Sequence, residues 1–121
     1  MGAYSGPDLK EDGLVLCLDA GNPKSYPGSG TTWTDLSGLG NTGTLVNGVG
    51  YNSGNGGALV FDGTDDYVQI PARSSNILTT LSMECWFKAN GTPLNGFHVL
   101  FQKEGGFSGG SVYGLRSLPI S

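Results

Sequence analysis

Three aspartates, Asp62, Asp65 and Asp66, lie close together in a segment that also holds glycine and threonine. Carboxylate oxygens are the hard ligands that Ca²⁺ prefers, and small neighbours leave backbone carbonyls accessible. The same residue types also build tight turns, because Asp bonds its own backbone and glycine tolerates positive φ. We expect residues 57–70 to form a hairpin of two short strands. The acidic turn, residues 62–66, is predicted first to set the register of this hairpin and second to be a calcium site.

Four aromatic residues could stack on a sugar ring: Trp33, Tyr26, Tyr51 and Tyr67. Tyr and Trp combine an apolar ring face with a polar edge, which suits the mixed surface of a glycan. Each of them could equally pack in a core or at a protein interface. Glycan recognition and a packing role therefore both stay open at this point.

Motifs that could support catalysis lack the setting that the chemistry needs. Residues 38–43 fit a dinucleotide-binding glycine pattern, but 44–46 read as a strand rather than the required helix. Residues 106–110 have nucleophile-elbow spacing, yet the single histidine, His98, precedes them instead of following. Glu84 has no second carboxylate on its expected strand, as glycoside hydrolysis would require. We expect a non-enzymatic protein with no catalytic residue and no organic cofactor.

Composition sets the broad class. A chain of 121 residues is sufficient for one core, so we expect an N-terminal arm over 1–12 and one domain over 13–121. The 22 glycines follow no three-residue period, which excludes collagen and favours many tight turns. A net charge of −4 offers no basic surface for nucleic acid, and no apolar run is long enough for membrane insertion. Cys17 and Cys85 could be bridged or buried; since no export signal is seen, free thiols are expected.

Short apolar runs separated by turn residues predict an all-β chain folded as an antiparallel β-sandwich. In the run 81–88 the odd positions, Leu81 to Phe87, are expected in the core and Trp86 at the sheet interface. One helical turn is expected within 72–80. The expected strands outside the hairpin are 14–18, 31–36, 44–46, 81–88, 97–101 and 111–115.

Several motifs occur in the same order as in a known family. They are 13–16 (GLVL), 19–20 (DA), 33–38 (WTDLSG), 41–45 (NTGTL), 61–68 (FDGTDDYV) and 82–88 (SMECWFK). In this order they resemble the laminin-G-like branch of the concanavalin A-like lectin/glucanase jelly rolls. Residues 18–30 (LDAGNPKSYPGSG) further resemble versions in tailed-phage structural proteins, including those of phages that infect marine and freshwater bacteria. The match runs from about residue 13 to 115.

The resemblance implies a jelly-roll fold and a structural function. Members of this family are usually longer, and 111–115 resembles a strand near the middle of their jelly roll. We therefore expect an incomplete sandwich that a partner chain finishes; a compact variant and a truncated product are the alternatives. Exposed strand edges and an apolar inner face would promote that association.

The implied function is that of a virion decoration, neck, tail or fibre component. Its expected partners are copies of itself or other virion proteins, with attachment to a cell-surface glycan as a further role. The alternative is a calcium-dependent carbohydrate-binding module of a larger extracellular protein. Some laminin-G-like and pentraxin-like relatives bind calcium at a sandwich edge, which favours the acidic turn as the place for Ca²⁺.

Overall fold

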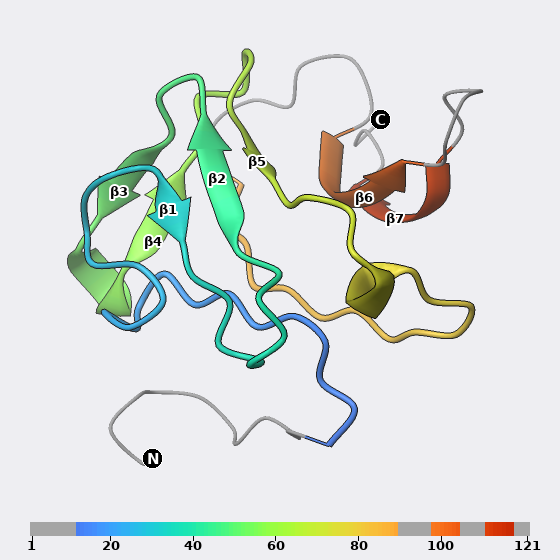
Figure 1. Ribbon diagram of the computed structural model, residues 1–121. Coiled ribbons are helices and arrows are strands. Elements are labelled where there is room, and N and C mark those ends of the chain that lie inside the picture. Colours follow the sequence, from blue (N-terminus) through green and yellow to red (C-terminus); the bar gives the residue numbers. More distant parts are fainter. Residues whose placement is uncertain (1–11, 90–97, 105–110, 118–121) are drawn as a thin grey trace. The chain divides into compact units, whose positions relative to one another are not determined.

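The computed structural model describes residues 12–89, 98–104 and 111–117, and its regular elements are nearly all short strands (Figure 1). Every strand pair in this part of the chain is antiparallel. This confirms the all-β, antiparallel character expected from the sequence. The chain divides between Thr79 and Thr80 into two compact units, which are described separately.

A three-stranded sheet organises the first unit. β1 (Thr32–Trp33) pairs with β2 (Gly43–Val46), and β2 pairs with β5 (Tyr67–Gln69). A Cβ atom placed on the buried Gly43 would lie 2.7 Å from a methyl carbon of Val68. Only glycine therefore lets Val68 pack against this point of β2 without a shift.

A second antiparallel pair of strands, β3 (Gly50–Asn52) and β4 (Ala58–Val60), continues the pair formed by β2 and β5. The 3-10 turn η1 (Gly54–Gly56) connects β3 with β4. Since β3 follows β2 and β5 follows β4, the two pairs form one interrupted β-ribbon, with β2–β3 as its first leg and β4–β5 as its second. Its closing turn has Asn55 at φ 54° and the next two glycines at 90° and 103°. Asn and Gly are the residues that adopt positive φ most readily.

The prediction that residues 57–70 form a hairpin with the acidic turn at its tip is wrong. β4 pairs with β3 and β5 pairs with β2, so the two strands that flank the acidic turn do not pair with each other. Between the paired segments, residues 47–49 of the first leg lie opposite the longer 61–66 of the second. The acidic turn is therefore an outward bulge of the β-ribbon. The glycine-rich segment that follows β3 closes the ribbon instead, because it supplies consecutive positive-φ positions.

Two other expected strands, 14–18 and 81–88, have no strand pairing within the described residues. In the first segment, the Cys17 N–H donates to the carboxylate of Asp35 and the Cys17 carbonyl accepts the N–H of Leu36, so these groups do not bond a strand. In the second, Cys85 and Phe87 are exposed rather than in the core, and Trp86 is 89% exposed. Alternation of apolar and polar residues predicts which face of a strand would be buried. A strand forms, however, only where a neighbouring strand supplies backbone hydrogen bonds.

Buried side chains in the described part of the first unit are mostly polar. The buried hydrophobic residues are Tyr26 and Leu45, and the buried polar residues are Asn22, Ser25, Asp35 and Asn41. Buried polar groups need hydrogen-bond partners, and these residues have them. Hydrogen bonding thus organises the loops of this unit as much as apolar packing does. η2 (Ser74–Asn76) provides the helical turn expected within 72–80.

In the described part of the second unit, β6 (His98–Glu104) pairs with β7 (Ser111–Ser117) in antiparallel orientation. The pairing runs from His98 opposite Ser117 to Glu104 opposite Ser111, with two register shifts. These strands confirm the two expected near 97–101 and 111–115 and extend beyond both. The predicted N-terminal arm and the 106–110 motif lie outside the described residues, apart from Asp12.

Candidate metal centre

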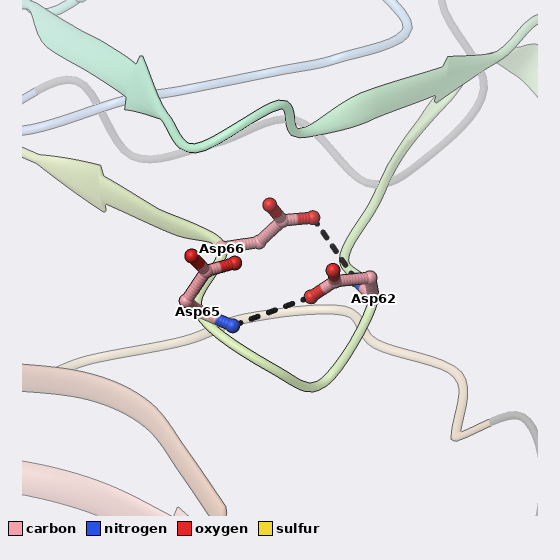
Figure 2. A group of neighbouring side chains, drawn as sticks. All are labelled: Asp62, Asp65 and Asp66. Atoms are coloured by element: carbon pink, nitrogen blue, oxygen red, sulfur yellow. Dashed lines mark hydrogen bonds between the residues drawn. The ribbon is translucent and has the colours of Figure 1, made fainter.

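The acidic turn is closed by its own hydrogen bonds. Asp62 Oδ1 accepts the backbone N–H of Thr64 at 2.7 Å and that of Asp65 at 3.4 Å. Asp66 Oδ2 accepts the backbone N–H of Asp62 at 3.0 Å. Figure 2 shows the bonds of Asp62 with its two neighbouring aspartates as dashed lines. An Asp that bonds the N–H two residues ahead forms an Asx turn, which accounts for the local shape.

Asn47 ties the acidic turn to the opposite leg of the β-ribbon. Its Nδ2 donates to the backbone carbonyl of Asp65 at 2.9 Å, and its own φ is 67°. Asn47 was not among the residues predicted from the sequence to form a site. The signal that could have found it is the Asn-Gly dipeptide at 47–48, since both residues tolerate positive φ.

The three predicted metal ligands come together. One carboxylate oxygen from each of Asp62, Asp65 and Asp66 lies within 4.8 Å of the others. Asp62 and Asp65 are exposed and Asp66 is half-buried. Asp66 Oδ1 is shielded from solvent and accepts no hydrogen bond in the described part of the chain.

Such an arrangement suits a calcium ion chemically. Like charges this close repel one another, and a divalent cation between them converts the repulsion into attraction. Ca²⁺ takes about six to eight oxygen ligands. The three carboxylates would supply part of that set, with backbone carbonyls and water for the rest.

Two of the four predicted glycan-stacking residues pack on each other. The rings of Tyr26 and Tyr51 lie 5.3 Å apart at 55°. Tyr26 is 3% exposed, and its hydroxyl donates to the Gly30 carbonyl at 2.9 Å. Burial leaves no face of Tyr26 open to a sugar, so this residue has a packing role. Tyr51 is more exposed, and Gly28 and Gly57 leave room for its ring.

The other two aromatic candidates lie on separate strands. Tyr67 starts β5 directly after Asp66 and is 48% exposed, which places an accessible ring next to the acidic turn. Trp33 is half-buried on β1, and its indole N–H is shielded without a partner in the described residues. Tyr67 is therefore the predicted aromatic residue nearest in sequence to the carboxylate group.

Asp35 is a structural centre that the sequence analysis gave no role. Its Oδ1 accepts the backbone N–H groups of Cys17 and Ser37, both at 2.9 Å. Its Oδ2 accepts the Ser37 hydroxyl at 2.6 Å and the Asn41 N–H at 2.9 Å. Burial alone would raise the pKa of Asp35, but these hydrogen bonds outweigh it and lower the pKa. The Asp-x-Ser spacing at 35–37 was the available signal.

Asn41 extends the same network. It is fully buried, and its Nδ2 donates to the Val15 carbonyl at 2.7 Å. Its Oδ1 accepts the Ser75 hydroxyl at 3.1 Å and the Asn76 side-chain amide at 3.2 Å. One side chain thus joins the 14–18 segment to η2.

Both cysteines are free in the structure. Burial, and then the nearby carboxylates of Asp19 and Asp35, raise the pKa of the Cys17 thiol. A raised pKa keeps this sulfur in the weakly reactive thiol form.

Of the motifs judged non-catalytic from the sequence, the structure describes residues 38–43, Glu84 and His98. Residues 38–43 lead into strand β2 and not into a helix. Glu84 is exposed outside any strand, and His98 is the first residue of β6. The nucleophile-elbow spacing at 106–110 lies outside the described residues.

Comparison with known proteins adds no relative. No protein-family model matches the chain, and neither curated proteins nor solved structures show a significant match. Among the described residues, no helix combines the length and apolarity needed to cross a bilayer. The laminin-G-like resemblance therefore stays a prediction.

Proposed function

We propose that this chain is a non-enzymatic structural or adhesion protein of a virion and acts by assembling with copies of itself or with other virion proteins. Its strands would belong to a jelly-roll sandwich that association completes. The observation that carries the proposal is the imbalance between buried and exposed apolar residues. In the described part, nine large hydrophobic residues are exposed, whereas only Tyr26 and Leu45 are buried hydrophobic residues.

Five of the nine exposed hydrophobic residues lie in two sequence segments. Val60, Phe61 and Tyr67 flank the acidic turn and are each 45–48% exposed. Trp86 and Phe87 are 89% and 60% exposed. Removing apolar area from water stabilises a contact by about 25 cal/mol per Å², and Trp and Phe are enriched in protein interfaces. The resemblance to tailed-phage structural proteins supports a virion as the setting.

Size-exclusion chromatography with light scattering tests this assembly. We expect oligomers for the wild-type chain and a shift towards monomer for the double variant Trp86→Ser, Phe87→Ser. Leu39→Ser is the matched control, because Leu39 is also exposed but lies in a different segment. Circular dichroism of each variant checks that the fold is kept. A wild-type chain that stays monomeric at every concentration would contradict the proposal.

A calcium-dependent carbohydrate-binding module of a larger extracellular protein is the second candidate. The convergence of three carboxylates beside the exposed Tyr67 favours it. In this function Ca²⁺ would hold the acidic turn, and the ring of Tyr67 would offer an apolar face to a sugar.

Calorimetric titration with Ca²⁺ tests the second candidate. The wild-type chain should bind, and Asp66→Asn should weaken binding at least tenfold, on the order of 1.4 kcal/mol. Asp12→Asn is the control, because Asp12 is exposed and lies outside the acidic turn. A glycan array with and without a chelator then tests sugar binding. Glycan signals that persist in chelator would contradict the calcium-dependent function.

A further inference from the structure

Two Asn-Gly pairs occupy contrasting places in the β-ribbon. Asn55-Gly56 lies in the closing turn, where Asn55 is exposed at φ 54° and ψ 33°. The Asn55 side chain makes no hydrogen bond in the described part of the chain. Asn47-Gly48 lies opposite the acidic turn, and Asn47 Nδ2 is held by the Asp65 carbonyl at 2.9 Å. The same dipeptide is therefore free at one site and restrained at the other.

We propose that Asn55 is a site of spontaneous deamidation, and that the hydrogen bond to the acidic turn protects Asn47. In the first step the backbone nitrogen of Gly56 attacks Cγ of Asn55. The new C–N bond closes a cyclic imide, the amide proton passes to solvent base, and Nδ2 leaves as ammonia with a proton from water. Water then opens the imide at either carbonyl, which gives aspartate or isoaspartate at position 55.

The local backbone favours this reaction. Ring closure needs rotation about the Cα–C bond of Asn55, and Gly54, Gly56 and Gly57 surround this residue with low-barrier backbone. Glycine at position 56 also places no Cβ next to the attacking nitrogen. Residues 54–56 are all exposed, so the water that opens the imide has access.

Isoaspartate at position 55 would alter the packing of the closing turn. It lengthens the main chain by a methylene group just before Gly56 and Gly57, which lie against the backbone of residues 20–21. A Cβ on Gly57 would lie 2.7 Å from the Ala20 carbonyl, and a Cβ on Gly21 would overlap the Gly56 carbonyl. Because these contacts are already close, we expect the longer main chain to shift the turn relative to residues 20–21.

In the test, the full chain is incubated in mildly alkaline buffer, and deamidation is followed by peptide mapping with isoaspartate detection. In the folded chain, we expect Asn55 to convert roughly fivefold faster than Asn47 or more, the effect of one hydrogen bond. In concentrated urea the two rates should converge, because the bond to Asp65 is lost. Asn55→Gln should remove the product at 55 and leave the rate at Asn47 unchanged.

Two results would overturn the inference. Equal rates in the folded chain would show that the bond of Asn47 gives no protection. A rate ratio that stays the same in urea would assign the difference to sequence context rather than to structure. Circular dichroism during the incubation establishes that the native measurement is made on folded protein.

Discussion

Replacing Asp35 should destabilise the first unit strongly, although the Asp35 side chain is small. Its two carboxylate oxygens accept four hydrogen bonds, from Cys17, Asn41 and, twice, Ser37. Asp35 is 7% exposed and Asn41 is fully buried, so water cannot easily replace the bond between them. Asp35→Ala removes the common acceptor and leaves three backbone N–H donors without a partner.

The expected magnitude follows from these contacts. A hydrogen bond to a charged group contributes about 1.5–3 kcal/mol, and a buried donor left unpaired costs about 1–3 kcal/mol. Because Cys17 and Ser37 are half-buried, solvent recovers part of the loss there. We therefore expect Asp35→Ala to lower the free energy of unfolding by about 3–5 kcal/mol. Asp35→Asn keeps one acceptor oxygen but turns its NH₂ towards donors, so about 2–3 kcal/mol is expected.

Acid should remove the advantage of the wild-type carboxylate. Burial tends to raise the pKa of Asp35, but its hydrogen bonds hold the pKa in the folded chain below the ordinary value of 3.8. A carboxyl with a lowered folded-state pKa stabilises fully above its unfolded pKa, and the effect disappears as pH falls through the folded value. The stability gap between wild type and Asp35→Asn should thus be constant near neutral pH and narrow below about pH 4.

Urea unfolding followed by circular dichroism, repeated across this pH range, measures both effects. Asp12→Asn serves as control, since an exposed carboxylate outside the network should change stability by less than about 0.5 kcal/mol. A loss below about 1 kcal/mol for Asp35→Ala would refute the central role of this residue. A gap that stays unchanged far below the ordinary pKa would refute the charge-based explanation.

Three further substitutions probe the packing of the first unit by the same unfolding assay. Asn41→Ala should cost about 3 kcal/mol, because its fully buried side chain bonds two distant segments; a loss under about 1 kcal/mol would contradict this. Gly43→Ala should cost about 1–3 kcal/mol through overpacking, whereas Gly50→Ala, with its nearest contact at 3.6 Å, should cost less; equal losses would rule out overpacking. Tyr26→Phe should cost about 1 kcal/mol for the lost bond to Gly30, and a neutral change would show that this bond adds nothing.

Local sequence signals predicted the strands that have clear turn residues on both sides. The run at 44–46 became β2, and those at 97–101 and 111–115 became parts of β6 and β7. Glycine borders each of these runs: Gly43 precedes 44–46, Gly96 precedes 97–101 and Gly110 precedes 111–115. Local propensity and termination thus agree, which is the condition under which such predictions succeed.

Pairing was harder to predict than strand position. The runs around the acidic turn are strands, but their partners are β3 and β2 and not each other. Two competing turn segments, one at 53–57 and one at 62–66, both contain Asp or Asn with glycine. The first closes the β-ribbon because it places Asn55, Gly56 and Gly57 in succession at positive φ. The sequence shows both turn signals, but which strands meet depends on the whole chain.

The candidate site was predicted in its residues but not in its position. Asp62, Asp65 and Asp66 converge as expected, yet they lie on a bulge beside the ribbon and not at its tip. Asn41 was missed because its side-chain partners are distant in sequence: the bond from Asn41 to Val15 spans 26 positions. No periodic or motif-based rule reports such contacts. Asp35 bonds the nearby Ser37, so the Asp-x-Ser spacing was a local signal for it.

The number of hydrogen-bond donors around each carboxylate distinguishes a carboxylate with a structural role from one that could bind a cation. Asp35 is buried and accepts four hydrogen bonds, so both of its carboxylate oxygens are satisfied by donors within the fold. In the acidic turn, the Asp65 carboxylate accepts none in the described part of the chain, and Asp66 Oδ1 has no partner. These oxygens remain free to coordinate a cation. A bound cation would also relieve the repulsion between the neighbouring carboxylates. Ca²⁺ should therefore raise the unfolding temperature of the wild-type chain and of Asp35→Asn by similar amounts, but not that of Asp66→Asn. Equal stabilisation of all three would place the cation elsewhere.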